Sequence, residues 1–170
     1  MVEAIGILLL TGFGALWLLM AANFASVLDW RAWLGVGLGT AALAAGAVKQ
    51  MLIAQHLPQV PAAATSATSA WFWTIVSLEW ILIIGAIILV ARQGRRDLIV
   101  SLIALIVGLH FLPLAWIFGA KLYYLTGGVI AAASLAALAL RERRQRQAVT
   151  CLACGMVLWL TSAAILLVPR

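Results

Sequence analysis

Six apolar segments, each about 20 residues long, dominate this chain and limit what it can fold into. A helix needs about 20 mostly apolar residues to cross about 30 Å of hydrocarbon. None of the segments alternates apolar and polar residues as the strands of a membrane β-barrel do. The sequence therefore predicts an all-α integral membrane bundle of six transmembrane helices, forming a single transmembrane domain over residues 1–170. The predicted spans are 4–27, 33–53, 70–91, 98–118, 122–140 and 149–168.

The composition agrees with a membrane protein. Hydrophobic residues make up 66% of the 170 residues and charged residues only 9%, against roughly a quarter charged in soluble domains. The net charge of +6 would also suit a nucleic-acid-binding protein, but the basic residues lie in short loops between the apolar segments. We therefore expect the lipid bilayer as the partner of this chain, and no nucleic acid.

The basic residues are divided unevenly between the two sides of the predicted bundle. Short loops rich in arginine and lysine face the cytoplasm, so this division predicts a cytoplasmic arginine side and non-cytoplasmic termini. The first apolar segment follows no positively charged region, so we expect a span there rather than a cleaved signal peptide. One side has Arg31, Arg92, Arg95, Arg96, Arg141, Arg143, Arg144 and Arg146, and the other has Lys49, Lys121 and Arg170.

The longest connection, residues 57–69, is uncharged and contains Pro58 and Pro61. Proline followed by a run of alanine, serine and threonine predicts a loop. Within it, Ala62 to Ala70 can form a short interfacial turn.

Small residues predict where the helices pack. Gly35 and Gly39 have the GxxxG spacing that allows two helix backbones to approach closely. The fifth segment repeats the theme with Gly127, Gly128 and several alanines. We therefore expect the bundle to be centred on the second and fifth helices.

Two ionisable side chains, Glu79 and His110, lie deep in the third and fourth predicted spans. Such groups are costly inside a bilayer, so each needs a partner or a water-filled cavity. Glu79 lies 13 positions before Arg92, and His110 lies 13 positions after Asp97. At 1.5 Å per residue, both lie about 20 Å from the hairpin that joins the two helices. The matched depth allows the two side chains to pair, either as a ligand site or as a purely structural interhelical bond.

Further polar residues outline an outward-facing pocket around this pair. Lys49 lies in the outer part of the second span, and Tyr123 and Tyr124 open the fifth. Pro113 removes a backbone donor beside His110. The alternatives are a lysine that extends to the interface and tyrosines that belong to an aromatic belt. The candidate ligand-binding residues are Glu79, His110, Lys49, Tyr123 and Tyr124.

The sequence predicts no catalytic residue, no metal site and no cofactor. It has no Ser/His/Asp set, no acidic cluster and no phosphate-binding loop. Cys151 and Cys154 have CxxC spacing, but small packing residues are a better interpretation than a redox pair or a zinc site. His56 and His110 lie at unequal depths, which argues against haem ligation. Enzyme activity is therefore left open, with a non-enzyme favoured.

The stretch from Gly108 to Gly127 reads GLHFLPLAWIFGAKLYYLTG. It resembles an uncharacterised family of small bacterial six-span membrane proteins, in which a His-Phe-Leu-Pro-type motif in the fourth span is followed by aromatic residues and glycine. The resemblance covers about twenty residues closely and the remainder only as a hydropathy pattern. It implies a multi-pass protein of the inner (plasma) membrane and draws attention to His110, Pro113 and Tyr124. It brings no known activity.

Three functions are compatible with these features. The first is binding or transport of a small solute, a proton or a cation through Glu79 and His110. The alternative is a structural or partner-binding membrane protein without catalytic activity, including a homo-oligomer. The third is an enzyme that modifies a lipid or a quinone, with His110 as base or ligand.

Overall fold

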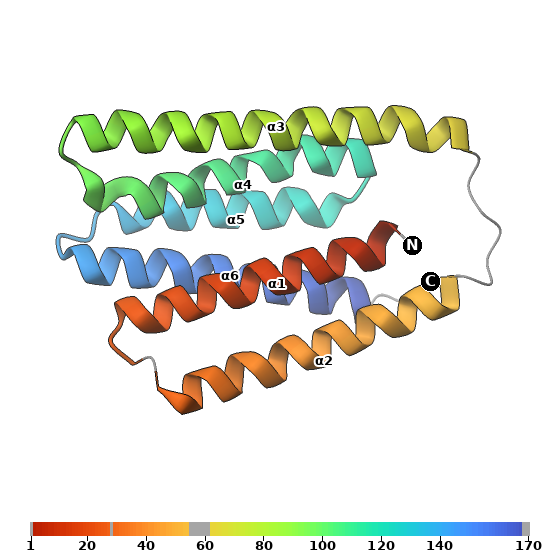
Figure 1. Ribbon diagram of the computed structural model, residues 1–170, viewed down its shortest axis with the longest axis horizontal. Coiled ribbons are helices and arrows are strands. Elements are labelled where there is room, and N and C mark those ends of the chain that lie inside the picture. The colour runs from red at the N-terminus through yellow and green to blue at the C-terminus, as the bar shows by residue number, and fades with distance from the viewer. Residues whose placement is uncertain (1, 28, 55–61, 168–170) are drawn as a thin grey trace. The chain divides into compact units, whose positions relative to one another are not determined.

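The computed structural model describes residues 2–27, 29–54 and 62–167, and every regular element in these ranges is helical (Figure 1). The prediction of an all-α fold is therefore confirmed. His56 and Arg170 lie outside the described residues. The elements are α1 (Val2–Phe24), α2 (Trp30–Ala54), α3 (Ala62–Arg92), the short 3-10 helix η1 (Arg96–Leu98), α4 (Ile99–Phe118), α5 (Lys121–Ala137) and α6 (Arg143–Leu167).

Five of the described helices are long and apolar enough to cross a membrane, as expected of a membrane protein. The exception is α5, which has 17 residues and is therefore about 25 Å long at 1.5 Å per residue. It ends three residues before the predicted span did, so a sixth span stays a prediction. The five apolar stretches are Gly6–Phe24, Trp30–Ile53, Ser69–Arg92, Arg96–Phe118 and Arg143–Leu167.

Helices α3 and α6 begin more than one helical turn before their predicted spans. Helix α3 begins at Ala62, so the prediction of a loop is wrong for residues 62–69, while 57–61 lie outside the described residues. After Pro61 no proline or glycine occurs before Gly85, and alanine has the highest helix propensity. Helix α6 begins at Arg143, inside the predicted loop 141–148, because arginine and glutamine are also good helix formers.

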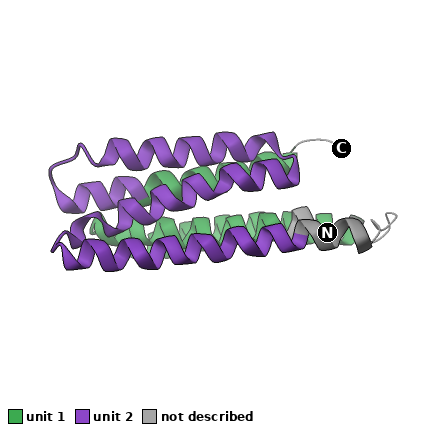
Figure 2. Cartoon of the chain, turned by 90° about the horizontal axis from the view of Figure 1, so that it is seen from above, with its two compact units in different colours: residues 1–58, 151–170 green, residues 59–150 purple. Residues whose placement is uncertain are grey.

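The contacts divide the chain into two compact units, which Figure 2 colours separately. Unit 1 comprises Met1–Pro58 and Cys151–Arg170 and contains α1, α2 and most of α6. Unit 2 comprises Gln59–Thr150 and contains α3, η1, α4, α5 and the start of α6. The single transmembrane domain expected for residues 1–170 stays a prediction.

In unit 2, α4 packs between α3 and α5 (Figure 1). Helix α3 turns one stripe of side chains, spaced alternately four and three residues apart, toward the rest of the unit, as a packed helix face requires. Every member of the stripe is buried or half-buried, and one of them is charged. The stripe consists of Phe72, Val76, Glu79, Ile83, Ala86 and Val90.

Two glycines bring α4 and α5 together. A Cβ atom added to Gly108 would lie 2.7 Å from the backbone nitrogen of Ala131, and one added to Gly127 would lie 2.5 Å from the backbone oxygen of Gly108. Both distances are shorter than any real side chain tolerates. A Cβ at Gly128 would meet no described atom within 4 Å. Helix α5 therefore packs closely on α4 through the first glycine of its pair, while the expected centring of the bundle on the second and fifth helices stays a prediction.

The start of α6 is tied to the start of α4 by two polar contacts. The guanidinium of Arg146 lies 3.0 Å from the carboxylate of Asp97. One helical turn further along α6, the hydroxyl oxygens of Thr150 and Ser101 are 3.3 Å apart in a buried hydrogen bond. These contacts fix the two loops at this end of unit 2 against each other.

In unit 1, Trp159 of α6 fills the space that two glycines leave open. Its ring contacts the positions at which Cβ atoms on Gly14 and Gly39 would lie, and its Nε1–H donates to the backbone oxygen of Thr11 at 3.2 Å. A Cβ at Gly35 would meet no described atom within 4 Å. Within unit 1, only Gly39 of the GxxxG pair therefore makes a close contact, and its partner is a tryptophan ring rather than a helix backbone.

Candidate functional site

Glu79 of α3 and His110 of α4 lie against each other in unit 2. Oε1 of Glu79 is 3.2 Å from Nδ1 of His110, and the two side chains are 13% and 16% exposed. Glu79 is the charged member of the inward stripe of α3, so the packing that buries that stripe also directs its carboxylate toward α4. The structure thus brings together the two residues whose depths matched in the sequence.

The imidazole of His110 is held by its own helix. Nδ1 lies 2.8 Å from the backbone oxygen of Val107, three residues earlier. Because a carbonyl oxygen can only accept a hydrogen bond, this contact favours the tautomer with a proton on Nδ1. The carboxylate of Glu79 therefore lies next to a nitrogen that already donates, and the ring orientation leaves Nε2 as the atom that can gain or lose a proton.

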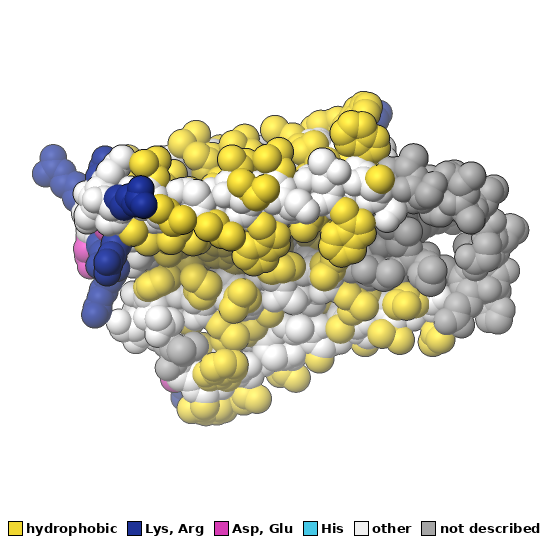
Figure 3. Space-filling view, turned by 45° about the horizontal axis from the view of Figure 1, so that its top comes forward, with side chains coloured by type: hydrophobic (Ala, Val, Ile, Leu, Met, Phe, Trp, Pro, Cys, Tyr) yellow, Lys and Arg dark blue, Asp and Glu magenta, His cyan; other side chains and the backbone are white. Residues whose placement is uncertain are grey.

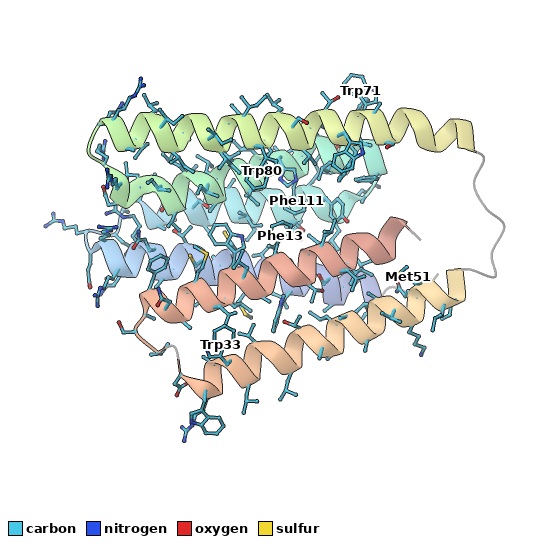
Figure 4. The ribbon with its side chains drawn as sticks, viewed as in Figure 1. Phe13, Trp33, Met51, Trp71, Trp80 and Phe111 are labelled. Atoms are coloured by element: carbon cyan, nitrogen blue, oxygen red, sulfur yellow. The ribbon has the colours of Figure 1, made fainter. Side chains whose placement is uncertain are left out.

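Aromatic rings from three helices continue from His110 toward the α4–α5 turn. The ring centroids of His110 and Phe111 are 4.8 Å apart, and those of Phe111 and Tyr123 are 5.7 Å apart. The ring centroids of Tyr123 and Phe118 are 6.5 Å apart, and those of Phe118 and Phe72 of α3 are 6.1 Å apart. Tyr123 is thus connected to the Glu79–His110 pair through the ring of Phe111, which Figure 4 labels.

The other predicted site residues are placed less centrally. Tyr124 is 46% exposed, whereas its neighbour Tyr123 is half-buried. Pro113 lies inside α4, three residues after His110, and is exposed. Lys49 is an exposed residue of unit 1, and its part in a common pocket stays a prediction. Sequence reasoning missed the backbone oxygen of Val107, because the rotamer of a histidine leaves no signal in the sequence.

Comparison with known families places these residues in a wider group. Residues 71–169, more than half of the chain, match a family of unknown function (DUF7010). The chain belongs to this family. The DUF7010 match includes Glu79, His110 and the stretch from Gly108 to Gly127, and it agrees with the expected resemblance to an uncharacterised family. No curated protein and no solved structure matches the chain.

The DUF7010 region also has a shallow, open depression along α3. Its lining residues all come from α3 itself: Trp73, Thr74, Ser77, Leu78 and Ile81. At 100° per residue, Glu79 lies about 200° around the helix from Ser77, so this depression and the Glu79–His110 pair are on different faces. In Figure 4, Trp71 projects from α3 on the side away from α4. These exposed apolar side chains suit contact with lipid.

The described part of the DUF7010 region offers no ready metal site. No group of three or more His, Cys, Asp or Glu side chains that could hold a metal ion occurs among the residues that the structure describes. Cys151 and Cys154 are both buried free thiols. Their burial agrees with the interpretation of the CxxC pair as small packing residues.

Proposed function

We propose that the protein binds a proton or a small cation at Glu79 and His110 and moves it across the membrane. The observation that carries this proposal is the 3.2 Å contact between the Glu79 carboxylate and Nδ1 of His110 on two apolar helices. An acid and a base at this depth are expensive in a bilayer and mark ion or proton pathways more often than ordinary packing does. The identity of the ion and its movement across the membrane are both parts of this proposal.

The chemistry of the pair suits an exchangeable cation. Glu79 supplies a carboxylate oxygen, which a proton or a cation can occupy, and His110 supplies a ring nitrogen that can gain or lose a proton. Helices α3 and α5 pack against α4 and carry further titratable groups. Between the level of the pair and the α4–α5 turn, these groups are Glu79 of α3 and Lys121, Tyr123 and Tyr124 of α5. Each side chain of the pair keeps a small exposed fraction, which an ion needs for entry.

The aromatic rings next to the pair favour a hydrophobic cation over a hydrated metal ion. Ring faces attract cations that have lost part of their water. We propose that Tyr123 and Tyr124, which open α5, line the outer approach to the pair.

Flux measurements on reconstituted protein test this function. We expect proteoliposomes containing the wild-type chain to move protons or tetraethylammonium, which crosses a protein-free bilayer only slowly, down an imposed gradient faster than empty liposomes. Glu79→Gln is expected to lower this flux at least tenfold, because it removes the only carboxylate of the pair. Flux equal to that of empty liposomes for the wild type, or unchanged flux in Glu79→Gln, would reject the proposal.

A double substitution separates function from packing. If the pair only joins α3 to α4, Glu79→Leu/His110→Leu should recover the stability that each single substitution loses, because apolar pairs replace buried polar pairs at little cost. Recovered stability with lost flux supports the transport function. Glu142→Gln, which removes an exposed carboxylate at the start of α6, serves as the matched control and should leave flux unchanged.

We also propose a topology of six spans in a bacterial inner membrane, with α5 as the fifth span and the arginine side in the cytoplasm. The division of eight basic residues from three supports this orientation. Alkaline phosphatase fused after Arg170 should then be active outside the cytoplasm, and a fusion after Gln93 should be inactive. The reverse pattern of the two activities contradicts the orientation, and equal activities contradict three spans between Gln93 and Arg170, and hence α5 as the fifth span.

A further inference from the structure

A second charged feature of unit 2 lies at the end of the unit opposite the α4–α5 turn. It consists of two loops together with the helix ends that flank them, residues 92–97 and 141–146, which are called the two loops below. Both loops are rich in arginine, and Figure 3 shows the basic side chains gathered at this end with few acidic ones beside them. All but one of these arginines are exposed. They are Arg92, Arg95, Arg96, Arg141, Arg143, Arg144 and Arg146.

The charge of this surface is strongly one-sided. Residues 92–97 and 141–146 contain seven arginines and two acids, Asp97 and Glu142, so their formal net charge is 7 − 2 = +5. Asp97 already pairs with Arg146 at 3.0 Å. Arg92, Arg95, Arg96, Arg141 and Arg143 still outnumber Glu142, the one further acid in these two ranges.

The two loops form one surface because the fold ties them together. The Arg146–Asp97 ion pair joins the loops directly, and the buried Ser101–Thr150 hydrogen bond holds the helices just below them. The side chain of Arg146 is 11% exposed, and its Nε atom is buried without a hydrogen-bond partner among the described residues. A rigid base thus presents the arginines of both loops on the same side.

The position of this surface along the helices points to its ligand. Three of the apolar stretches that can cross a membrane end or begin at an arginine of this group: one ends at Arg92, and two begin at Arg96 and Arg143. The arginines therefore lie where the hydrocarbon gives way to lipid headgroups. About one turn deeper, Leu89 of α3 and Val149 of α6 are 57% and 45% exposed, which provides apolar surface for acyl chains.

We propose that this arginine surface binds the phosphate headgroups of anionic phospholipids. Guanidinium groups match phosphate oxygens with paired hydrogen bonds, and anionic lipids attract basic segments next to spans. The bound lipid would hold the two loops, and hence the starts of α4 and α6, in their relative positions. This binding is independent of the Glu79–His110 pair and of any transport through it.

Thermal unfolding of the full chain in a neutral detergent tests the proposal with three probes: dioctanoyl phosphatidylglycerol, dioctanoyl phosphatidylcholine and inorganic phosphate. We expect only phosphatidylglycerol to raise the unfolding midpoint, by at least about 3 °C, as stabilisation by a bound ligand requires. The rise should shrink as NaCl increases from about 0.05 M to about 0.5 M, because salt screens exposed charges. Arg92→Gln/Arg95→Gln and Arg141→Gln/Arg143→Gln should each lose at least half of it.

The matched control removes two positive charges elsewhere, in Arg31→Gln/Lys121→Gln, and should keep the full rise. All substituted positions are exposed, so the variants should fold, and a single symmetric peak in gel filtration verifies this. An equal rise with phosphatidylcholine, or an undiminished rise in both arginine variants, overturns the proposal. An equal rise with inorganic phosphate overturns the lipid assignment and indicates a site for soluble anions.

Discussion

Replacing Trp159 with alanine is expected to lower the unfolding free energy by about 3 kcal/mol or more, as large-to-small changes of tryptophan do in packed interiors. The ring occupies the space beside Gly14 and Gly39, so its removal leaves a gap next to both glycines. The indole N–H also donates to the backbone oxygen of Thr11. The thermal unfolding midpoint of purified protein in detergent measures the effect.

Two variants test the explanation of this loss. Trp159→Phe keeps most of the ring but removes the N–H donor, and should lose only about 1 kcal/mol. Trp80→Ala, at a position that is 57% exposed, removes a tryptophan from the surface of α3 and should leave the midpoint nearly unchanged. Equal midpoints for Trp159→Ala and Trp80→Ala would contradict the packing role of Trp159.

Replacing Gly127 with alanine is expected to destabilise the protein by about 1–3 kcal/mol, the usual range for overpacking a close contact. The added Cβ atom would lie 2.5 Å from the backbone oxygen of Gly108. A backbone atom in the middle of α4 cannot move away as the end of a flexible side chain can, so the two helices must separate. The midpoint should fall by about 2–4 °C for each kcal/mol lost.

The neighbouring glycine provides a control that differs by one position. A Cβ at Gly128 meets no described atom within 4 Å, and alanine favours a helix over glycine by about 1 kcal/mol. Gly128→Ala should therefore match or exceed the wild-type midpoint. If both alanine variants lower the midpoint equally, the loss is a property of α5 itself and not of its contact with α4.

The helices followed from the sequence because a membrane demands a long run of apolar residues, and such runs are visible without any knowledge of contacts. The start of α3 could not be predicted in the same way. Pro58 and Pro61 suggested a loop, whereas the helix begins with the alanines directly after Pro61. The shortness of α5 was also missed. Helix ends depend on local turns, and apolar composition continues through Leu138 and Leu140 without indicating that the helix has ended.

The sequence predicted the depth of the candidate site residues in the membrane but not the direction in which their side chains point. Depth could be counted along the hairpin, which is why Glu79 and His110 were expected at the same level. Rotation about each helix axis could not be counted, and the contact depends on the stripe that includes Glu79 facing α4. The contact of Gly39 could not be predicted from the GxxxG motif either, because its partner Trp159 lies 120 positions further along the chain.

The length of α5 has a consequence for the surrounding bilayer. A helix of 17 residues is about 5 Å shorter than the average hydrocarbon thickness, so a bilayer that meets both of its ends must thin beside it. Such a dimple brings the headgroup region and its water closer to the membrane midplane on one side of unit 2. His110 lies eight residues before the end of α4 at Phe118, a distance of about 12 Å along the helix. Local thinning would bring the headgroup region and its water nearer to His110, so lipid thickness would control how far the acid–base pair lies from water.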